Sequence, residues 1–124
     1  MIGARRDRGQ AAVEFAIVTP AVIVVVLGVV QVVALAARHA ALEQLARSGA
    51  RAASVAADPA GAADAAIGRA SSDPGLTIVT STGGDDVTVR VTLVDPTSVP
   101  IVGSFIGDVE LTATATMPRE PPNG

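Results

Sequence analysis

The longest apolar run in the chain lies near its start, from Phe15 to Ala37, and reads FAIVTPAVIVVVLGVVQVVALAA. These 23 residues carry no charge. A helix needs about 20 apolar residues to cross the hydrocarbon core of a bilayer. We therefore expect a transmembrane helix over residues 10–37. Gln31, the polar amide within it, is interpreted as hydrogen-bonded to backbone or to a neighbouring group.

The helical pattern continues beyond this run. Glu43 and Arg47 have the spacing of an ion pair one turn apart on a helix. From Gln10 to Ala57, a continuous helix would be roughly 70 Å long at about 1.5 Å per residue. Spacings of three and four predict one apolar stripe along its second half, made of Leu42, Leu45, Gly49, Ala52 and Ala56.

The pattern then changes from a helical period to alternation. Asp58 followed by Pro59 is typical of a helix start and predicts a second helix to about Ala70. Alternating apolar and polar positions predict strands at 76–80, 87–93 and 109–116. An antiparallel sheet with one apolar face needs a cover, which the small-residue stripe can provide. The expected fold class is α+β, with the long helix packed on a three-stranded antiparallel sheet.

Two further segments fit this pattern less simply. The segment 99–106 is too apolar for a solvated loop, although Pro96 and Pro100 disfavour a central strand around it. We favour its folding back to close the open end of the small core; the alternative is a patch for a neighbouring subunit or the membrane surface. Residues 118–124 are predicted to form a disordered tail.

Charge is distributed unevenly along the chain. Arg5, Arg6 and Arg8 form a basic leader over residues 1–9, whereas the part after the apolar run has six arginines and ten acidic residues. Because basic flanks stay in the cytoplasm, we expect the N-terminus inside and an α+β domain, residues 38–117, outside. Its acidic balance argues against nucleic acid as a partner.

The sequence contains no recognisable catalytic constellation. It has no cysteine, so neither a disulfide nor a thiolate metal site can form. His39 is the only histidine and is interpreted as a solvated side chain just outside the bilayer. The segment Gly83–Asp86 is interpreted as a hairpin turn. We therefore expect no enzymatic activity, no cofactor, no metal and no small-molecule substrate.

Glu14 has two interpretations. In the intact chain it borders the apolar run, where an interfacial carboxylate is tolerated. If the chain were cut after Gly9, Gln10 would carry a new α-amino cation and Glu14 would follow four residues later. A carboxylate packed among apolar helices needs a partner, and the amine of a neighbouring chain is a suitable one.

The stretch Gly9-Gln10-Ala11-Ala12-Val13-Glu14-Phe15 resembles a type IV prepilin processing site, because it follows arginines and precedes a long apolar helix. More narrowly, RRDRGQAAVEFAIVTPAVIVVVLGVVQ is similar to the opening of TadE-like proteins. These are minor pilins or pseudopilins of tight-adherence (Flp) pilus systems. The Ala-rich residues 41–54 and the Leu-Thr-Ala-Thr-Ala-Thr-Met segment 111–117 also resemble that family.

The resemblance implies a pilin-like fold and cleavage by a prepilin peptidase between Gly9 and Gln10. It implies that the three leader arginines hold residues 1–9 in the cytoplasm, and that Glu14, followed by Phe15, sets the register of assembly. The implied partners are the membrane, the peptidase, other pilin-like subunits and the assembly machinery. The implied location is the bacterial cytoplasmic membrane, as a single-pass protein, with the cell surface or a pilus as its later destination.

Two alternatives remain open. Ala34-Leu35-Ala36 matches the small-x-small pattern of signal-peptide cleavage, which would release a secreted or anchored envelope-binding module. Against this, the apolar run exceeds the usual length of about 7–15 residues, and the helical pattern continues through the cut. The other alternative is an uncleaved single-pass subunit of an export complex.

Overall fold

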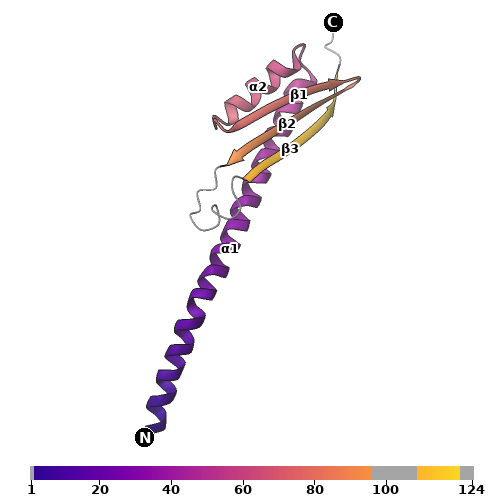
Figure 1. Cartoon of the computed structure of the whole chain (residues 1–124). Coiled ribbons are helices and arrows are strands. Elements are labelled where there is room, and N and C mark those ends of the chain that lie inside the picture. Colours follow the sequence, from indigo (N-terminus) through magenta and orange to yellow (C-terminus); the bar gives the residue numbers. More distant parts are fainter. Residues whose placement is uncertain (1, 96–108, 121–124) are drawn as a thin grey trace. The chain divides into compact units, whose positions relative to one another are not determined.

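The computed structural model describes residues 2–95 and 109–120 (Figure 1). The elements in chain order are α1 (Ile2–Ser54), α2 (Pro59–Ala70), β1 (Leu76–Gly83), β2 (Asp86–Asp95) and β3 (Val109–Pro118). The chain divides into two compact units, Met1–Ala37 and Arg38–Gly124. The α+β fold class expected from the sequence is confirmed.

The first unit is the N-terminal part of α1. The helix already begins at Ile2, so the basic leader is helical and continuous with the apolar run. Pro20 lies inside the helix and cannot donate to the carbonyl one turn before it. The neighbouring Thr19 hydroxyl donates a hydrogen bond of 2.6 Å to the Phe15 carbonyl, which satisfies that polar side chain within the helix.

The second unit contains an antiparallel sheet in the order β1-β2-β3. Residues Gly84 and Asp85 connect β1 to β2 in a two-residue turn, and Gly84 has a φ of 57°. Such hairpin turns need positive φ, which glycine adopts without a Cβ clash. The three strands expected from the alternating pattern are confirmed, each extended by one or more residues.

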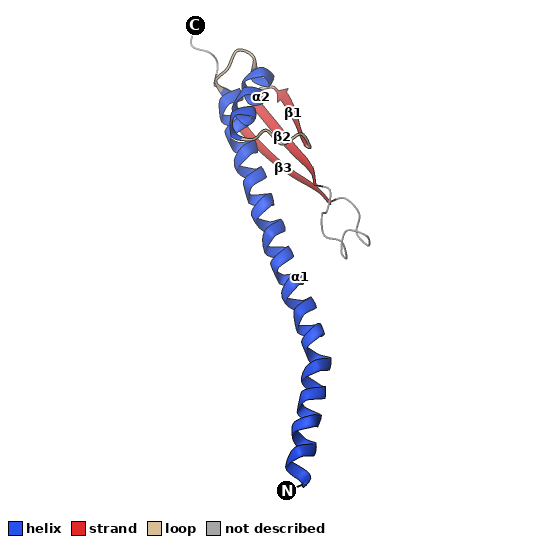
Figure 2. Ribbon diagram, turned by 90° about the vertical axis from the view of Figure 1, so that its left-hand side faces the viewer, coloured by secondary structure: helices blue, strands red, loops and turns tan. Residues whose placement is uncertain are grey.

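One face of this sheet is covered by α2 and by the part of α1 that belongs to the second unit (Figure 2). Val87, Val89 and Val91 of β2 form the centre of the core and are fully buried. Because β2 is the middle strand, these three side chains receive cover from both neighbouring strands and both helices. The helices contribute mostly small side chains to this core, namely Leu42, Ala46, Ala50, Ala53, Ala63 and Ile67.

The buried face of α1 agrees only in part with the stripe expected from the sequence, of which Leu42 and Gly49 are buried. Leu45, Ala52 and Ala56 of that stripe are only half-buried, whereas Ala46, Ala50 and Ala53 are fully buried. The reason is steric, since alanines let the helix backbone approach the sheet more closely than leucine would. Gly49 shows how close this approach is, because a Cβ there would lie 2.7 Å from Ile67 Cδ1.

The start of α2 follows the sequence expectation. Asp58 is its N-cap, and the Asp58 carboxylate accepts a hydrogen bond of 3.2 Å from the Gly61 N–H. Pro59 occupies the first helical turn, where its missing N–H leaves no unsatisfied group. The helix therefore begins and ends where the sequence predicted, at Pro59 and Ala70.

The end of β3 corrects the prediction of a tail from residue 118. Pro118 is the last residue of β3, and the Arg119 N–H donates to the Asp85 carbonyl. The Glu120 N–H donates to the Ser54 carbonyl at 2.9 Å, which satisfies a carbonyl left open at the end of α1. Residues 121–124 and the apolar segment 99–106 lie outside the described residues.

Candidate processing and assembly segment

All residues that the sequence singled out for processing and assembly lie on the first unit's helix. They are Arg5, Arg6, Arg8, Gly9, Gln10, Glu14 and Phe15, and each is exposed. Phe15 is 74% exposed, a large fraction for an aromatic side chain. These side chains are therefore available to molecules other than this chain.

Gly9 has no packing role within the described residues. A Cβ built at Gly9 would meet no atom within 4 Å. Glycine inside a helix is less favourable than alanine by about 1 kcal/mol, so its use without a steric need calls for another reason. The packing of the described residues supplies no such reason.

Glu14 lies one helical turn after Gln10, on the same face of α1. Within the described residues, Glu14 makes no ion pair. Its carboxylate stands at the border of the apolar run, where inserting the helix into a bilayer would remove much of its water. A partner from another molecule would then stabilise the charge.

The residues after Glu14 form an apolar helix that is exposed on all sides. The apolar side chains from Val13 to Val33 are between half and three-quarters exposed. The best window of this helix has a mean hydropathy of 2.7, and none of that window is buried. By length and composition, α1 is the one helix among the described residues that is able to cross a membrane.

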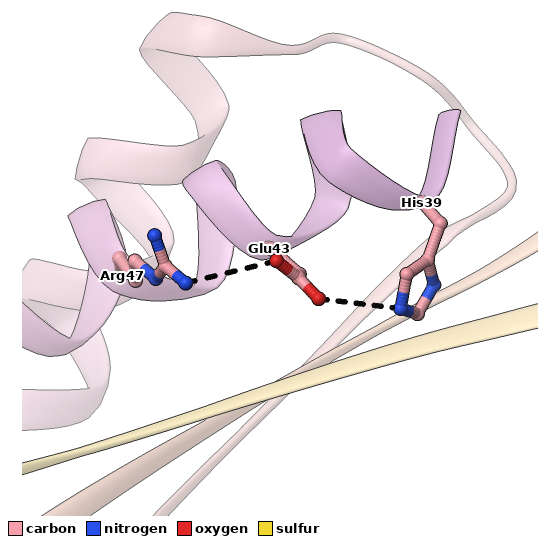
Figure 3. A network of polar contacts seen from close by, with 3 residues as sticks. All are labelled: His39, Glu43 and Arg47. Carbon is pink, nitrogen blue, oxygen red and sulfur yellow. Dashed lines mark ion pairs between the residues drawn. The ribbon is translucent and has the colours of Figure 1, made fainter. Parts of the chain in front are cut away.

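The polar contacts of α1 in the second unit form a short series on its surface (Figure 3). The Glu43 carboxylate lies between two basic side chains, 3.4 Å from His39 Nε2 and 3.7 Å from Arg47 Nη2. The expected pair between Glu43 and Arg47 is therefore confirmed. All three side chains are about half-exposed or more, so each pair contributes only a few tenths of a kcal/mol to helix stability, on the order of 0.3–0.5.

The described residues contain no cluster of three or more histidine, cysteine or acidic side chains placed to hold a metal ion. The distinctive features of the candidate segment are a helical basic leader, an unpacked glycine, an unpartnered carboxylate and a long exposed apolar helix.

The described residues thus combine one apolar helix with the length and composition to cross a membrane and one small α+β unit. A model of the family described as TadE-like protein matches residues 9–51. The resemblance seen in the sequence is thus confirmed over this stretch. No curated protein and no solved structure matches the chain.

The boundaries of the match are informative. It begins at Gly9, the residue before the expected cut, and ends at Arg51, one turn before the end of α1. It therefore covers the helix from the expected cut almost to Ser54, while α2 and the sheet lie outside it. The likeness resides in the helix, which is where the candidate processing and assembly residues lie.

Proposed function

We propose that this chain is a minor pilin-like or pseudopilin-like structural subunit of a tight-adherence (Flp-type) pilus or secretion assembly. The observation that carries the proposal is the family match beginning at Gly9 and followed at once by an apolar helix exposed along its length. The proposed role is structural, and we expect no catalysis by this chain.

In this proposal, a prepilin peptidase cuts between Gly9 and Gln10 at the cytoplasmic face of the membrane. Arg5, Arg6 and Arg8 keep the leader on that face, and the second unit lies outside. The cut removes all three arginines and leaves an α-amino cation on Gln10. It thereby converts a basic flank into a single positive charge one helical turn before Glu14.

Assembly then brings the cut end among the apolar helices of other pilin-like subunits. A carboxylate at the centre of a bilayer costs about 2.5–3.5 kcal/mol, and less near the interface. Pairing Glu14 with the Gln10 amine of a neighbouring subunit would offset this cost. Because the pair forms at one relative height only, it would set the register between subunits, with the exposed Phe15 beside it.

The test is the N-terminus of the mature protein, determined by intact mass and terminal sequencing after extraction from membranes of a host with its own prepilin peptidase. A start at Gln10 is the expected result. A start at Ala37 or nearby would replace the proposal with a secreted or anchored envelope-binding module. A start at Met1 or Ile2 would leave an uncleaved membrane anchor.

Two variants sharpen this test. Gly9→Val should abolish the start at Gln10, because a branched side chain replaces the smallest residue before the cut. Gly68→Val is the matched control, since Gly68 is also a helical glycine whose added Cβ would meet no atom within 4 Å. Processing of both variants at the normal rate would contradict a role for Gly9 in recognition.

A further inference from the structure

The bond that the proposed cut would break lies inside an unbroken helix. The helix α1 runs from Ile2 to Ser54 and therefore includes both Gly9 and Gln10. In an α-helix, the Gly9 carbonyl accepts a hydrogen bond from the N–H four residues later, that of Val13. Hydrolysis adds water to this carbonyl carbon and leaves a carboxylate on Gly9 and an α-amino group on Gln10. Because proteolysis acts on a locally opened chain, the helix must open here before it is cut.

A helix that opens up to Gly9 loses the hydrogen bonds of a single turn around the scissile bond. When the helix starts at Gln10, the N–H groups from Gln10 to Val13 have no carbonyl partner, whereas every later hydrogen bond is retained. Gly9 then becomes the residue just before the helix, the N-cap, whose backbone is typically extended. The Gly9–Gln10 bond thereby moves from the inside of the helix to its end.

Gly9 favours this opening in two ways. Inside a helix glycine is less favourable than alanine, and at the N-cap it is much more favourable than alanine. Neither effect depends on a contact with another part of the chain, and a Cβ at Gly9 would meet no atom within 4 Å. Gly9 therefore destabilises the closed helix and stabilises the opened one.

The side chains on either side of the bond act in the same direction. Arg5 and Arg8 are three residues apart and so are neighbours on the closed helix, where like charges repel. Asp7, the acid of the leader, has no arginine three or four positions away to pair with. After the bond, Ala11 and Ala12 have the highest helix propensity of any residue type. A weak helical segment therefore meets a strong one at the expected cut.

We infer that Gly9 is a hinge at which α1 opens, so that residues 2–8 leave the helix and the peptidase cuts the opened form. The inference rests on the cut proposed above and deepens it. It gives Gly9 a positioning role that acts through the backbone, in addition to the fit of a small residue to the enzyme. The rate of cutting should then follow the population of the opened form and not the size of residue 9 alone.

The pair Gly9→Ala and Gly9→Ser separates the hinge from a simple requirement for a small residue. Alanine is smaller than serine, but serine is a poorer helix former and one of the preferred N-caps. In a host with its own prepilin peptidase, pulse labelling and intact mass measure how fast the start at Gln10 appears. We expect this rate to be about 10-fold higher for Gly9→Ser than for Gly9→Ala. An equal or higher rate for Gly9→Ala would overturn the hinge.

Hydrogen exchange measures the opening without a peptidase, so it also decides the question if neither variant is cut. The unprocessed full chain is prepared in detergent micelles from a host that lacks the peptidase. The amides of residues 10–13 should exchange about 10-fold more slowly in Gly9→Ala than in the unchanged chain, and at nearly the unchanged rate in Gly9→Ser.

Gly28→Ala is the matched control for this measurement. Gly28 lies in the same helix, and its added Cβ would also meet no atom within 4 Å. We expect Gly28→Ala to leave the exchange of residues 10–13 unchanged. Exchange that is not slowed by Gly9→Ala, or that Gly28→Ala slows equally, would overturn the hinge.

The outcomes separate this inference from the proposed function. A chain that starts at Gln10, although Gly9→Ala does not slow its exchange, would overturn the hinge alone. Slower exchange in Gly9→Ala, in a chain that the host with the peptidase never cuts, would contradict the processing proposal alone.

Discussion

Glycine serves different ends at different positions of this chain. At Gly84 it supplies a positive φ in the β1–β2 turn, and at Gly49 it makes room for Ile67. At Gly9 and Gly28 no described atom approaches the place of a side chain. The sequence shows the same letter at all four positions. Only the structure shows that the chain's own conformation or packing requires glycine at Gly49 and Gly84 but not at Gly9 and Gly28.

Gly49→Ala should destabilise the second unit by about 1–3 kcal/mol. The new Cβ would lie not only 2.7 Å from the end of the Ile67 side chain but also 3.2 Å from Ile67 Cγ1 and 3.3 Å from Val89 Cγ1, so two fully buried side chains would have to move. This loss should exceed the helix-propensity gain of about 1 kcal/mol. Urea denaturation in detergent micelles measures the difference. Gly68→Ala should instead stabilise the unit, because its added Cβ would meet no atom within 4 Å. Equal stability of the two variants would show that the side chains around Ile67 rearrange without a cost in stability.

Thr80 presents the opposite case, a polar group with no partner. Its Oγ1 is buried and, among the described residues, makes no hydrogen bond. Thr80→Val keeps the shape and removes the unsatisfied hydroxyl, so we expect stabilisation by about 1 kcal/mol. Thr88→Val is the control, since it breaks the 2.9 Å bond between the Thr88 and Thr116 hydroxyls. A loss of stability in Thr80→Val would show that its hydroxyl is solvated.

At the scale of elements, the sequence predicted those with strong local signals. The Asp58–Pro59 start defined α2, and the regular alternation of valine and threonine predicted β2. The buried face of α1 was predicted only in part. Leu42 and Gly49 are buried as expected, but the pattern selected Leu45 instead of Ala46 because alanine has a weaker hydropathy signal. Which face packs depends on how closely helix and sheet approach, and a one-dimensional pattern does not contain that distance.

This correction is testable with two alanines of α1. Ala46→Leu should destabilise the second unit by about 1–3 kcal/mol, because Ala46 is 0% exposed and faces the sheet. Ala52→Leu should change stability by less than about 0.5 kcal/mol, because Ala52 is only half-buried. Hydrogen exchange of the Val87–Val91 amides reports both. A larger effect at Ala52 than at Ala46 would show that Ala52 lies on the buried face of α1, as the sequence pattern predicted.

At the scale of the whole molecule, the two units differ in whether their apolar side chains are buried within the unit itself. The second unit buries its apolar residues on its own sheet, whereas the first exposes nearly all of its apolar side chains. The candidate site could be located from the sequence because its residues lie close together along one helix. Its partners could not, because they belong to other molecules.

Glu14→Ala tests the whole-molecule proposal. We expect normal membrane insertion but a loss of incorporation into the assembly by about 100-fold or more. Without the Glu14 carboxylate, the α-amino cation of Gln10 in the neighbouring subunit would be buried unpaired, which costs about 3–5 kcal/mol. Quantitative immunoblotting of membrane and sheared surface fractions measures both steps. Glu43→Ala is the matched control, since Glu43 is a half-exposed residue that pairs within its own helix. Normal incorporation of Glu14→Ala would reduce Glu14 to an interfacial charge.

The hydrogen bond from Glu120 to Ser54 has a consequence for how such chains can be recombined. It holds the end of β3 beside the end of α1, so the segment from α2 to β3 begins and ends at neighbouring points. We therefore expect that this segment can be replaced by another domain without a change in the course of α1. The family match stops at residue 51, so the segment that this bond closes lies outside it.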